Sequence, residues 1–243
     1  MSKHVFVTGG SGYLGRPLIS RLLERGHEVK ALVRQGSEGK LPADCVPVRG
    51  NALDPTSYAN RIQPADTFVQ LVGVSHPNPS KAEQFRNVDL VSGTGAIQSA
   101  QQAGIQHFVY LSVAHPAPVM KAYIAVRSEC EDRLRNSGLN ATVLRPWYVL
   151  GPGHHWPFAL LPMYWLLARI PSTRDGAKRL GLVTLEQMVS SMLWAIENPC
   201  RGVRVLGVPE IRASQAFQPL HNRTMNSDTK ESDQSNSSNY QSA

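Results

Sequence analysis

HVFVTGGSGYLGR, residues 4–16, is the stretch that decides the fold of this 243-residue chain. It begins with Val5, Phe6 and Val7, a short apolar run that is typical of a strand buried on both faces. Glycines follow at the point where such a strand would turn into a helix. The stretch therefore predicts a strand, a glycine-rich loop and a helix that runs to Arg25 and stops at Gly26.

Three of the glycines have distinct uses in such a loop. Gly10 allows a tight turn, Gly12 lets backbone N–H groups approach a pyrophosphate, and Gly15 lets the helix press against the strand. The helix N-terminus then faces the phosphates. We interpret the loop as a dinucleotide site, the alternative being a merely tight structural turn. The expected cofactor contacts are Thr8, Gly9, Gly10, Ser11, Gly12, Tyr13, Leu14 and Gly15.

The residue that ends the second strand narrows the choice of dinucleotide. Val29 to Val33 predicts that strand, and Arg34 follows it about twenty residues after the glycines, where an acid ordinarily holds the ribose 2′-OH. A guanidinium can instead pair with a 2′-phosphate, with Ser11 or Arg16 as further donors. The sequence thus favours NADP(H) over NAD(H). The alternative for Arg34 is an ordinary solvated surface charge.

Composition and charge limit the class of protein. Hydrophobic residues make up 42% of the chain and charged residues 18%, as in ordinary globular proteins. The three cysteines are far apart and no signal peptide precedes the first strand, so we expect a cytoplasmic protein with reduced thiols. The net charge of +7 is scattered rather than clustered, which disfavours nucleic-acid binding and favours small anionic ligands. We expect no transmembrane segment and no metal site.

Strands and helices alternate along the rest of the chain. Further strands are expected over 46–49, 67–73, 107–112, 141–144 and 203–208, and helices over 81–103, 121–136 and 185–196. This alternation predicts an α/β fold, a doubly wound parallel sheet of the Rossmann type. At the carboxyl ends of its strands, the turn with Asn51 and Ala52 would lie along the adenine, and Val72 and Gly73 would face the same crevice.

A hydroxyl, a phenol and a cation lie on two consecutive predicted elements, the fifth strand and the helix that follows it. Ser112 ends the fifth strand, and Tyr123 and Arg127 are four residues apart on the following helix, so they share one face. We expect these three residues to form a constellation beside the cofactor. The alternative for the helical pair is a half-buried tyrosine with a solvated arginine.

The C-terminal part divides the chain into three regions. We expect a dinucleotide-binding domain over 1–153, a small substrate-capping region over 154–212 that completes the fold, and a disordered polar tail over 213–243. Residues 158–170, FALLPMYWLLARI, are apolar but too short to span a membrane, so they predict a pocket wall or, alternatively, an interfacial or partner-binding patch. His154 and His155 are adjacent and lack the spacing of zinc ligands.

With these residues in place, the chain resembles the extended and atypical short-chain dehydrogenases/reductases, and within them the NmrA-like and complex I accessory-subunit-like group. The matching motifs are TGGSGYLG at 8–15, Asn87-Val88-Asp89 with Gly93-Thr94, Tyr110-Leu111-Ser112, Tyr123 with Arg127 in place of YxxxK, and Arg145-Pro146-Trp147-Tyr148. Together they cover about residues 4–210.

The resemblance implies roles for the catalytic candidates. Tyr123 would be the general acid/base, Arg127 would stand where the family has a lysine that holds the nicotinamide ribose, and Ser112 would orient the substrate oxygen. Arginine keeps the charge of lysine but not its shape or hydrogen-bond geometry. Residues 145–153 are expected to leave the sixth strand as a loop, in which Pro146, Tyr148 and Val149 would lie under the nicotinamide.

Two functions follow from these expectations. The first is an NADP(H)-dependent oxidoreductase that moves a hydride to or from a small carbonyl, quinone or sugar-nucleotide substrate. The second is a non-catalytic NADPH-binding redox sensor or assembly subunit, which the arginine in place of the lysine favours.

Overall fold

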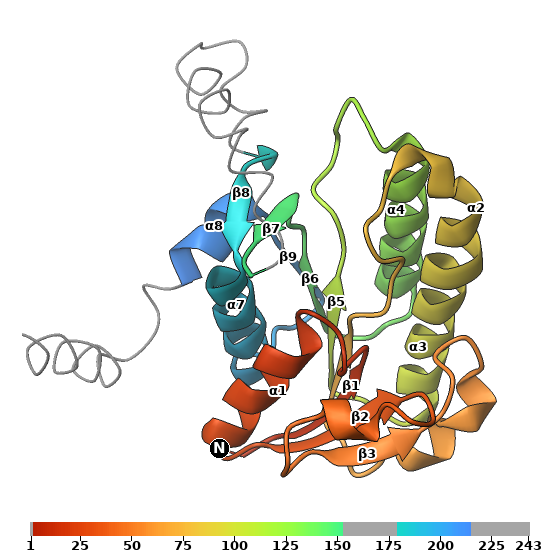
Figure 1. Cartoon of the computed structure of the whole chain (residues 1–243), viewed down its shortest axis with the longest axis vertical. Helices are drawn as coiled ribbons and strands as arrows, with labels where there is room; N and C mark the ends of the chain where they lie inside the picture. Colours follow the sequence, from red (N-terminus) through yellow and green to blue (C-terminus); the bar gives the residue numbers. More distant parts are fainter. Residues whose placement is uncertain (1, 153–178, 215–243) are drawn as a thin grey trace, which may run out of the picture.

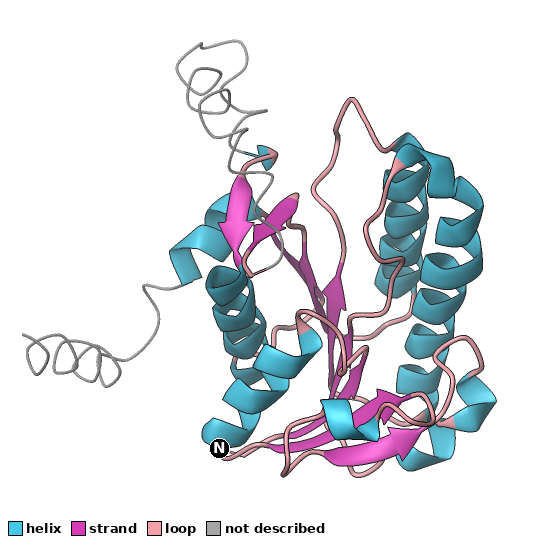
Figure 2. Ribbon diagram, in the orientation of Figure 1, coloured by secondary structure: helices cyan, strands magenta, loops and turns pink. Residues whose placement is uncertain are grey.

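A computed structural model describes residues 2–152 and 179–214 of the chain. Seven parallel strands form one sheet in the order β3-β2-β1-β4-β5-β6-β9, and helices cover both of its faces (Figure 1, Figure 2). The predicted doubly wound α/β fold is therefore confirmed. The strands are β1 (His4–Thr8), β2 (Glu28–Val33), β3 (Val46–Arg49), β4 (Thr67–Gln70), β5 (His107–Leu111), β6 (Ala141–Leu144) and β9 (Val203–Leu206).

The helices pack in two layers, because alternate residues of the central strands point to opposite faces. In Figure 1, α1 and α7 lie on one side of the sheet, and α3 and α4 lie on the other. Val5 and Val7 face the first layer, whereas Phe6 faces the second, where its ring lies 5.2 Å from that of Phe68. The helices are α1 (Gly15–Glu24), α2 (Ala82–Gln84), α3 (Val91–Gln102), α4 (Lys121–Asn136), α7 (Leu185–Glu197) and α8 (Val208–Ala213).

The expected helix over 81–103 is divided in the structure. A π-helical segment, η5 (Phe85–Leu90), separates α2 from α3, and glycines in α3 let neighbouring groups come close. A side chain at Gly93 would meet Cys130 Sγ at 2.8 Å, and one at Gly95 would meet Pro55 Cγ at 2.5 Å. The glycines that weaken α3 locally thus permit its close packing.

The stretch after β6 differs from the expected loop. Residues Tyr148–Leu150 form β7, which pairs in parallel with β8 (Leu182–Thr184) in a separate two-stranded sheet. The expectation of an irregular loop here was wrong, because a strand of three residues has no periodic pattern and its partner lies far along the chain. A capping box of Thr184 and Gln187 then starts α7.

The described part of the C-terminal region joins the main sheet. Strand β9 pairs with β6, and α7 packs against α1. The predicted capping role of residues 154–212 stays a prediction. The apolar segment 158–170, both adjacent histidines His154 and His155, and the tail beyond Ser214 lie outside the described residues. Among the residues that are described, no helix is long and apolar enough to cross a bilayer.

Candidate functional site

A cavity of about 640 Å³ lies at the carboxyl ends of β1, β2 and β4. Backbone and side chains of the glycine loop form one wall, the end of β2 and the turn after β3 form the next, and the chain after β4 forms the third. The loop contributes Gly9, Ser11, Gly12, Tyr13, Leu14 and Gly15. The predicted loop therefore opens onto a hollow at the edge where open α/β sheets bind their ligands.

The glycine loop is tightly wound. The Gly12 N–H donates to the Gly9 carbonyl at 3.0 Å, and Gly9 has a φ of 75°, a conformation that favours glycine. A side chain at Gly15 would lie 2.4 Å from the Gly9 oxygen, so the helix can begin here only without a Cβ. No side chain among the described residues caps the start of α1. The loop and helix start therefore form a cradle of backbone that an anionic group fits.

Some of the predicted cofactor residues do not line this cavity. The Thr8 hydroxyl donates to the Val69 carbonyl and to Gln70, so it joins β1 to β4 inside the protein. A side chain at Gly10 would meet Ala31 in the core. Neither residue is among those that line the cavity, and the same is true of Pro146, Tyr148 and Val149.

Arg34 stands at the β2 end of the cavity. Its side chain is exposed, lines the cavity, and makes no hydrogen bond or ion pair with the described part of the chain. Asn51 and Ala52, after the neighbouring strand β3, also line the cavity, and the Asn51 side-chain oxygen accepts the Leu53 N–H at 3.0 Å, which stabilises that turn. Arg16, also considered as a donor, is exposed but does not line the cavity.

The chain after β4 forms the far end of the cavity. Val72, Gly73 and Val74 line it, and the Val74 N–H donates to the carboxylate of Asp89 at 3.0 Å. A side chain at Gly73 would lie 2.2 Å from Arg127 Nη2, so the guanidinium of Arg127 sits directly behind this backbone. The wall of the cavity is thus backed by a buried polar group.

Arg127 is enclosed by partners. Only 3% of the residue is exposed, its Nη2 donates to Asp89 at 2.6 Å, and its Nη1 donates to the Leu111 carbonyl at 2.7 Å. Burial lowers the pKa of Arg127, but Tyr123, Tyr110 and Asp89 raise it by more, so the group stays charged. The alternative of a solvated arginine was wrong, because Asp89 neutralises the buried cation.

Tyr123 lies beside this arginine. The guanidinium carbon of Arg127 is 5.2 Å from the centre of the Tyr123 ring, and the ring of Phe85 packs on the same tyrosine at 4.8 Å. The cation therefore lies over the ring face of the tyrosine. This contact confirms the prediction that Tyr123 and Arg127 share one face of α4.

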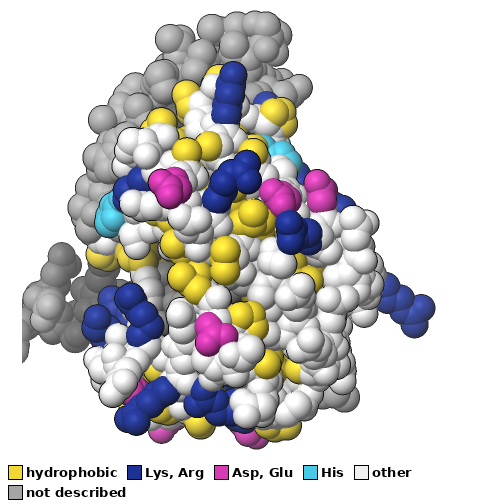
Figure 3. Space-filling model, turned by 90° about the vertical axis from the view of Figure 1, so that its right-hand side faces the viewer, with side chains coloured by type: hydrophobic (Ala, Val, Ile, Leu, Met, Phe, Trp, Pro, Cys, Tyr) yellow, Lys and Arg dark blue, Asp and Glu magenta, His cyan; other side chains and the backbone are white. Residues whose placement is uncertain are grey.

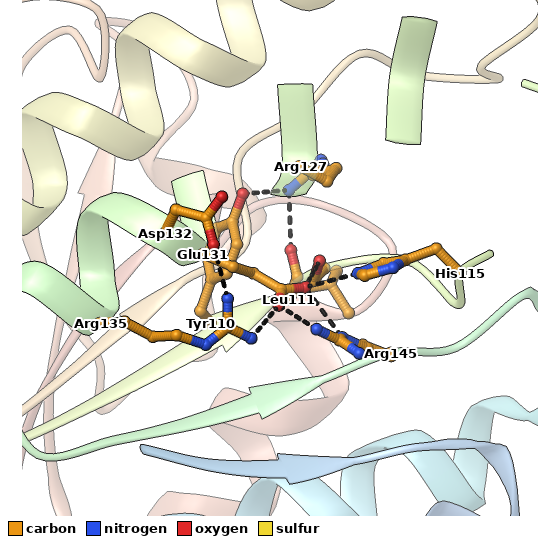
Figure 4. Close-up of polar contacts among 9 residues, drawn as sticks. Tyr110, Leu111, His115, Arg127, Glu131, Asp132, Arg135 and Arg145 are labelled. Carbon is orange, nitrogen blue, oxygen red and sulfur yellow. Dashed lines mark hydrogen bonds and ion pairs between the residues drawn. The ribbon is translucent and has the colours of Figure 1, made fainter. Parts of the chain in front are cut away.

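Ser112 belongs to a second polar cluster, drawn in part in Figure 4. Its hydroxyl donates to Glu131 at 2.5 Å, and Glu131 also pairs with Arg145 and Arg135 and lies 3.5 Å from His115 Nε2. Burial raises the pKa of Glu131, but its hydrogen bonds with Arg145 and Ser112 lower it by more, and the net pKa lies below the ordinary value. Ser112 is thus held by a buried carboxylate.

The three catalytic candidates are therefore only partly brought together. Tyr123 and Arg127 touch, whereas Ser112 faces Glu131, and none of the three lines the cavity. Sequence reasoning missed the roles of Asp89 and Glu131. Asp89 was part of a quoted motif, and Glu131 precedes Arg135 by four residues on one helix face, a spacing that indicates their ion pair and could have pointed to Glu131.

Charge elsewhere on the described surface is mixed. On the face drawn in Figure 3, Lys and Arg side chains are distributed over the whole face and are interspersed with Asp and Glu. The described residues contain no group of three or more His, Cys, Asp or Glu that could hold a metal ion.

A glycine loop that opens onto a cavity at the carboxyl edge of a doubly wound parallel sheet defines a nucleotide-binding Rossmann protein. Residues 9–153, more than half of the chain, match the model of a family described as NAD(P)H-binding. The chain belongs to this NAD(P)H-binding family, within the extended and atypical short-chain dehydrogenases/reductases, which confirms the resemblance found in its motifs.

The sequence identity to individual curated proteins is low. The chain is 25% identical over 203 residues to a ceramide reductase of Caulobacter vibrioides, an overlap of 82% of this chain and 62% of that protein. It is 26% identical over 144 residues to the photosystem II assembly factor Ycf39 of Synechocystis, an overlap of 58% and 43%. The chain thus spans less than two thirds of the length of these curated relatives.

Solved structures share the fold. The Bordetella bronchiseptica enzyme WbmH in complex with NAD+ superposes with a TM-score of 0.65 at 22% identity, over 85% of this chain and 76% of that one. A UDP-glucose 4-epimerase of Thermus thermophilus in complex with NAD gives 0.62 at 17% identity, over 88% and 82%.

Proposed function

We propose that this protein is an NADP(H)-dependent oxidoreductase that moves a hydride to or from a small carbonyl, quinone or sugar-nucleotide substrate. The observation that carries the proposal is the 640 Å³ cavity, which runs from the glycine loop and Arg34 to Gly73 at the carboxyl edge of the sheet. Relatives named as reductases support it, among them the ceramide reductase of Caulobacter vibrioides.

The residues of the cavity fit a dinucleotide in a definite orientation. The loop N–H groups and the start of α1 would hold the pyrophosphate, and the turn with Asn51 and Ala52 would lie along the adenine. The chain at Val72 and Gly73 would then face the nicotinamide. The bound dinucleotide supplies the hydride, and the protein contributes binding, orientation and the handling of a proton.

Arg34 supports the preference for a 2′-phosphate. Its guanidinium lines the cavity and has no partner in the described part of the chain, so all its donors are available to a ligand. Ser11 lines the same cavity and offers a hydroxyl as a second donor.

Proton transfer falls to Tyr123 in this proposal. Arg127 places a permanent cation over the ring, and its own donors go to Asp89 and Leu111. Arg127 would therefore pack on Tyr123 and position its ring, and it would not hold the ribose.

The test is a titration of the purified protein with NADPH and NADH, followed by nicotinamide fluorescence, before and after adding a panel of carbonyl compounds and quinones. Preferential binding of NADPH and loss of fluorescence with one member of the panel are the expected results. Absence of binding to either dinucleotide would reject the proposal.

The positions of Ser112 and Arg127 favour a second candidate, a non-catalytic NADPH-binding sensor or assembly subunit. Both side chains are engaged in buried clusters and neither lines the cavity. The relative Ycf39 is named as an assembly factor, and the apolar segment 158–170 would supply the contact with a protein partner. Tight NADPH binding without turnover, unchanged in Tyr123→Phe, would favour this candidate; loss of turnover in Tyr123→Phe with binding intact would favour the enzyme.

A further inference from the structure

A second cavity, of about 360 Å³, lies at the carboxyl ends of β5, β6 and β9. Its lining shares no residue with the cavity of the glycine loop. Three of its lining side chains are basic: His115 follows β5, Arg145 follows β6, and Arg179 precedes β8. Val205 and Val208 give it an apolar wall beside these groups.

Hydrogen-bond donors of both arginines remain available. Arg145 pairs with Glu131 through Nε and Nη2, and Arg179 donates to the Pro116 carbonyl only through Nε, at 3.2 Å. Their other guanidinium nitrogens have no partner in residues 2–152 and 179–214. His115 Nε2 is buried and makes no hydrogen bond there, although Glu131 lies 3.5 Å away.

Two acidic groups lie at this site, and both already accept hydrogen bonds. Glu131 is fully buried, and its two oxygens accept from Ser112, Arg145 and Arg135. Glu210 lines the cavity from α8, and its carboxylate accepts the Gly207 N–H at 2.9 Å. The free guanidinium donors of Arg145 and Arg179 suit an acceptor-rich anion, and the exposed carboxylate in the lining, that of Glu210, already accepts a backbone N–H through one of its oxygens.

We propose that this cavity binds the carboxylate or phosphate group of the molecule that the enzyme reduces, so that the substrate is an anionic carbonyl compound. The inference rests on the proposed oxidoreductase. Both cavities lie at the carboxyl edge of one sheet, and β5, whose end reaches the second cavity, pairs with β4, whose end reaches the first. The apolar wall accommodates the carbon chain of an organic anion.

Direct binding tests the site without requiring turnover. Succinate and inorganic phosphate are titrated into the NADPH-bound protein by calorimetry, in wild type, Arg179→Gln and the control Arg201→Gln. Arg179 is exposed and makes one side-chain hydrogen bond with the described residues, so its substitution should leave the fold intact, and Arg201 is an exposed arginine outside the cavity. Binding of at least one anion should weaken by about tenfold or more in Arg179→Gln.

Three results of the titration would overturn the proposal: no binding of either anion to wild type, equal binding in Arg179→Gln, or an equal loss in Arg201→Gln. His115→Asn supplies a second variant and should also weaken binding. Which of the two probes binds distinguishes a carboxylate site from a phosphate site.

Turnover then tests the link to substrate. A series of aliphatic oxo acids and their methyl esters, which lack the charge, is compared as substrates with NADPH. We expect a higher kcat/KM for the acids, lost in Arg179→Gln and kept in Arg201→Gln. Equal kcat/KM for acids and esters would reject the substrate role. Turnover of no compound in this series or in the carbonyl and quinone panel would reject the oxidoreductase, while the titration still decides whether the cavity binds anions.

Discussion

Arg127 stands where the family has a lysine, and its guanidinium makes contacts of a different kind. A lysine ends in a single ammonium, whereas the guanidinium of Arg127 reaches Asp89, the Leu111 carbonyl and the face of Tyr123 at the same time. The guanidinium lies behind the backbone of Gly73, so it supports the wall of the cavity and does not line it. The residue therefore contributes to stability as well as to the charge near Tyr123.

Removing Asp89 should be costly because it leaves a buried cation without its partner. We expect Asp89→Ala to lower the free energy of unfolding by about 3 to 5 kcal/mol, measured by urea denaturation. Glu129→Ala, which breaks the exposed pair with Arg133 on the same helix, is the matched control and should cost about 0.3 to 0.5 kcal/mol. Equal effects of the two variants would show that the buried pair has no special role.

The proposed preference for NADPH over NADH depends on one residue, Arg34. Arg34→Glu replaces a cation by an anion in the cavity, so NADPH binding should weaken by about tenfold or more, with NADH little affected. Fluorescence titration of both dinucleotides measures this, with Arg201→Glu as a control of equal charge change. An equal loss for both dinucleotides would refute a role for Arg34 at the 2′-phosphate.

At the scale of elements, the glycine loop depends on the absence of a side chain at one position. Gly15→Ala would place a Cβ 2.4 Å from the Gly9 oxygen, which forces the loop and the start of α1 apart. We expect this variant to lose NAD(P)H binding in the same titration. Gly39→Ala is the control, because a side chain there meets nothing within 4 Å. Retention of binding in Gly15→Ala would contradict the proposed pyrophosphate cradle.

Elements with a clear period were predictable, and those without one were not. Helix α4 and strand β6 have the bounds expected from sequence, because each has a regular pattern that ends at a turn residue. Strands β7 and β8 have three residues each and exist only because they pair with each other. The partners of Ser112 and Arg127 depend on how η5, α4 and β5 pack, which the order of residues along the chain does not encode locally.

For the whole molecule, a buried histidine makes stability depend on pH. Burial lowers the pKa of His107 to about 4, from an ordinary value near 6.5. Between these values the unfolded chain binds a proton that the folded protein does not, so stability is highest above about pH 6.5 and falls as the pH drops toward 4. The loss should reach roughly 3 kcal/mol.

Urea denaturation at several pH values between 7 and 4 measures this dependence. His107→Gln should flatten the curve over that interval, because glutamine does not titrate. The pKa of Glu131 lies below its ordinary value, so the stability that Glu131 contributes is lost only on further acidification. An unchanged slope in His107→Gln would rule out His107 as the source.

The pairing of β9 with β6 has a consequence for synthesis on the ribosome. Six strands of the sheet are complete by Leu144, but the strand that covers the outer edge of β6 is made of residues 203–206. A nascent chain must therefore carry an open, parallel strand edge, bordered by apolar side chains, until its last strand emerges. During that interval the open edge of β6 can pair with another chain, so a shorter delay between the synthesis of β6 and of β9 leaves less time for mispairing.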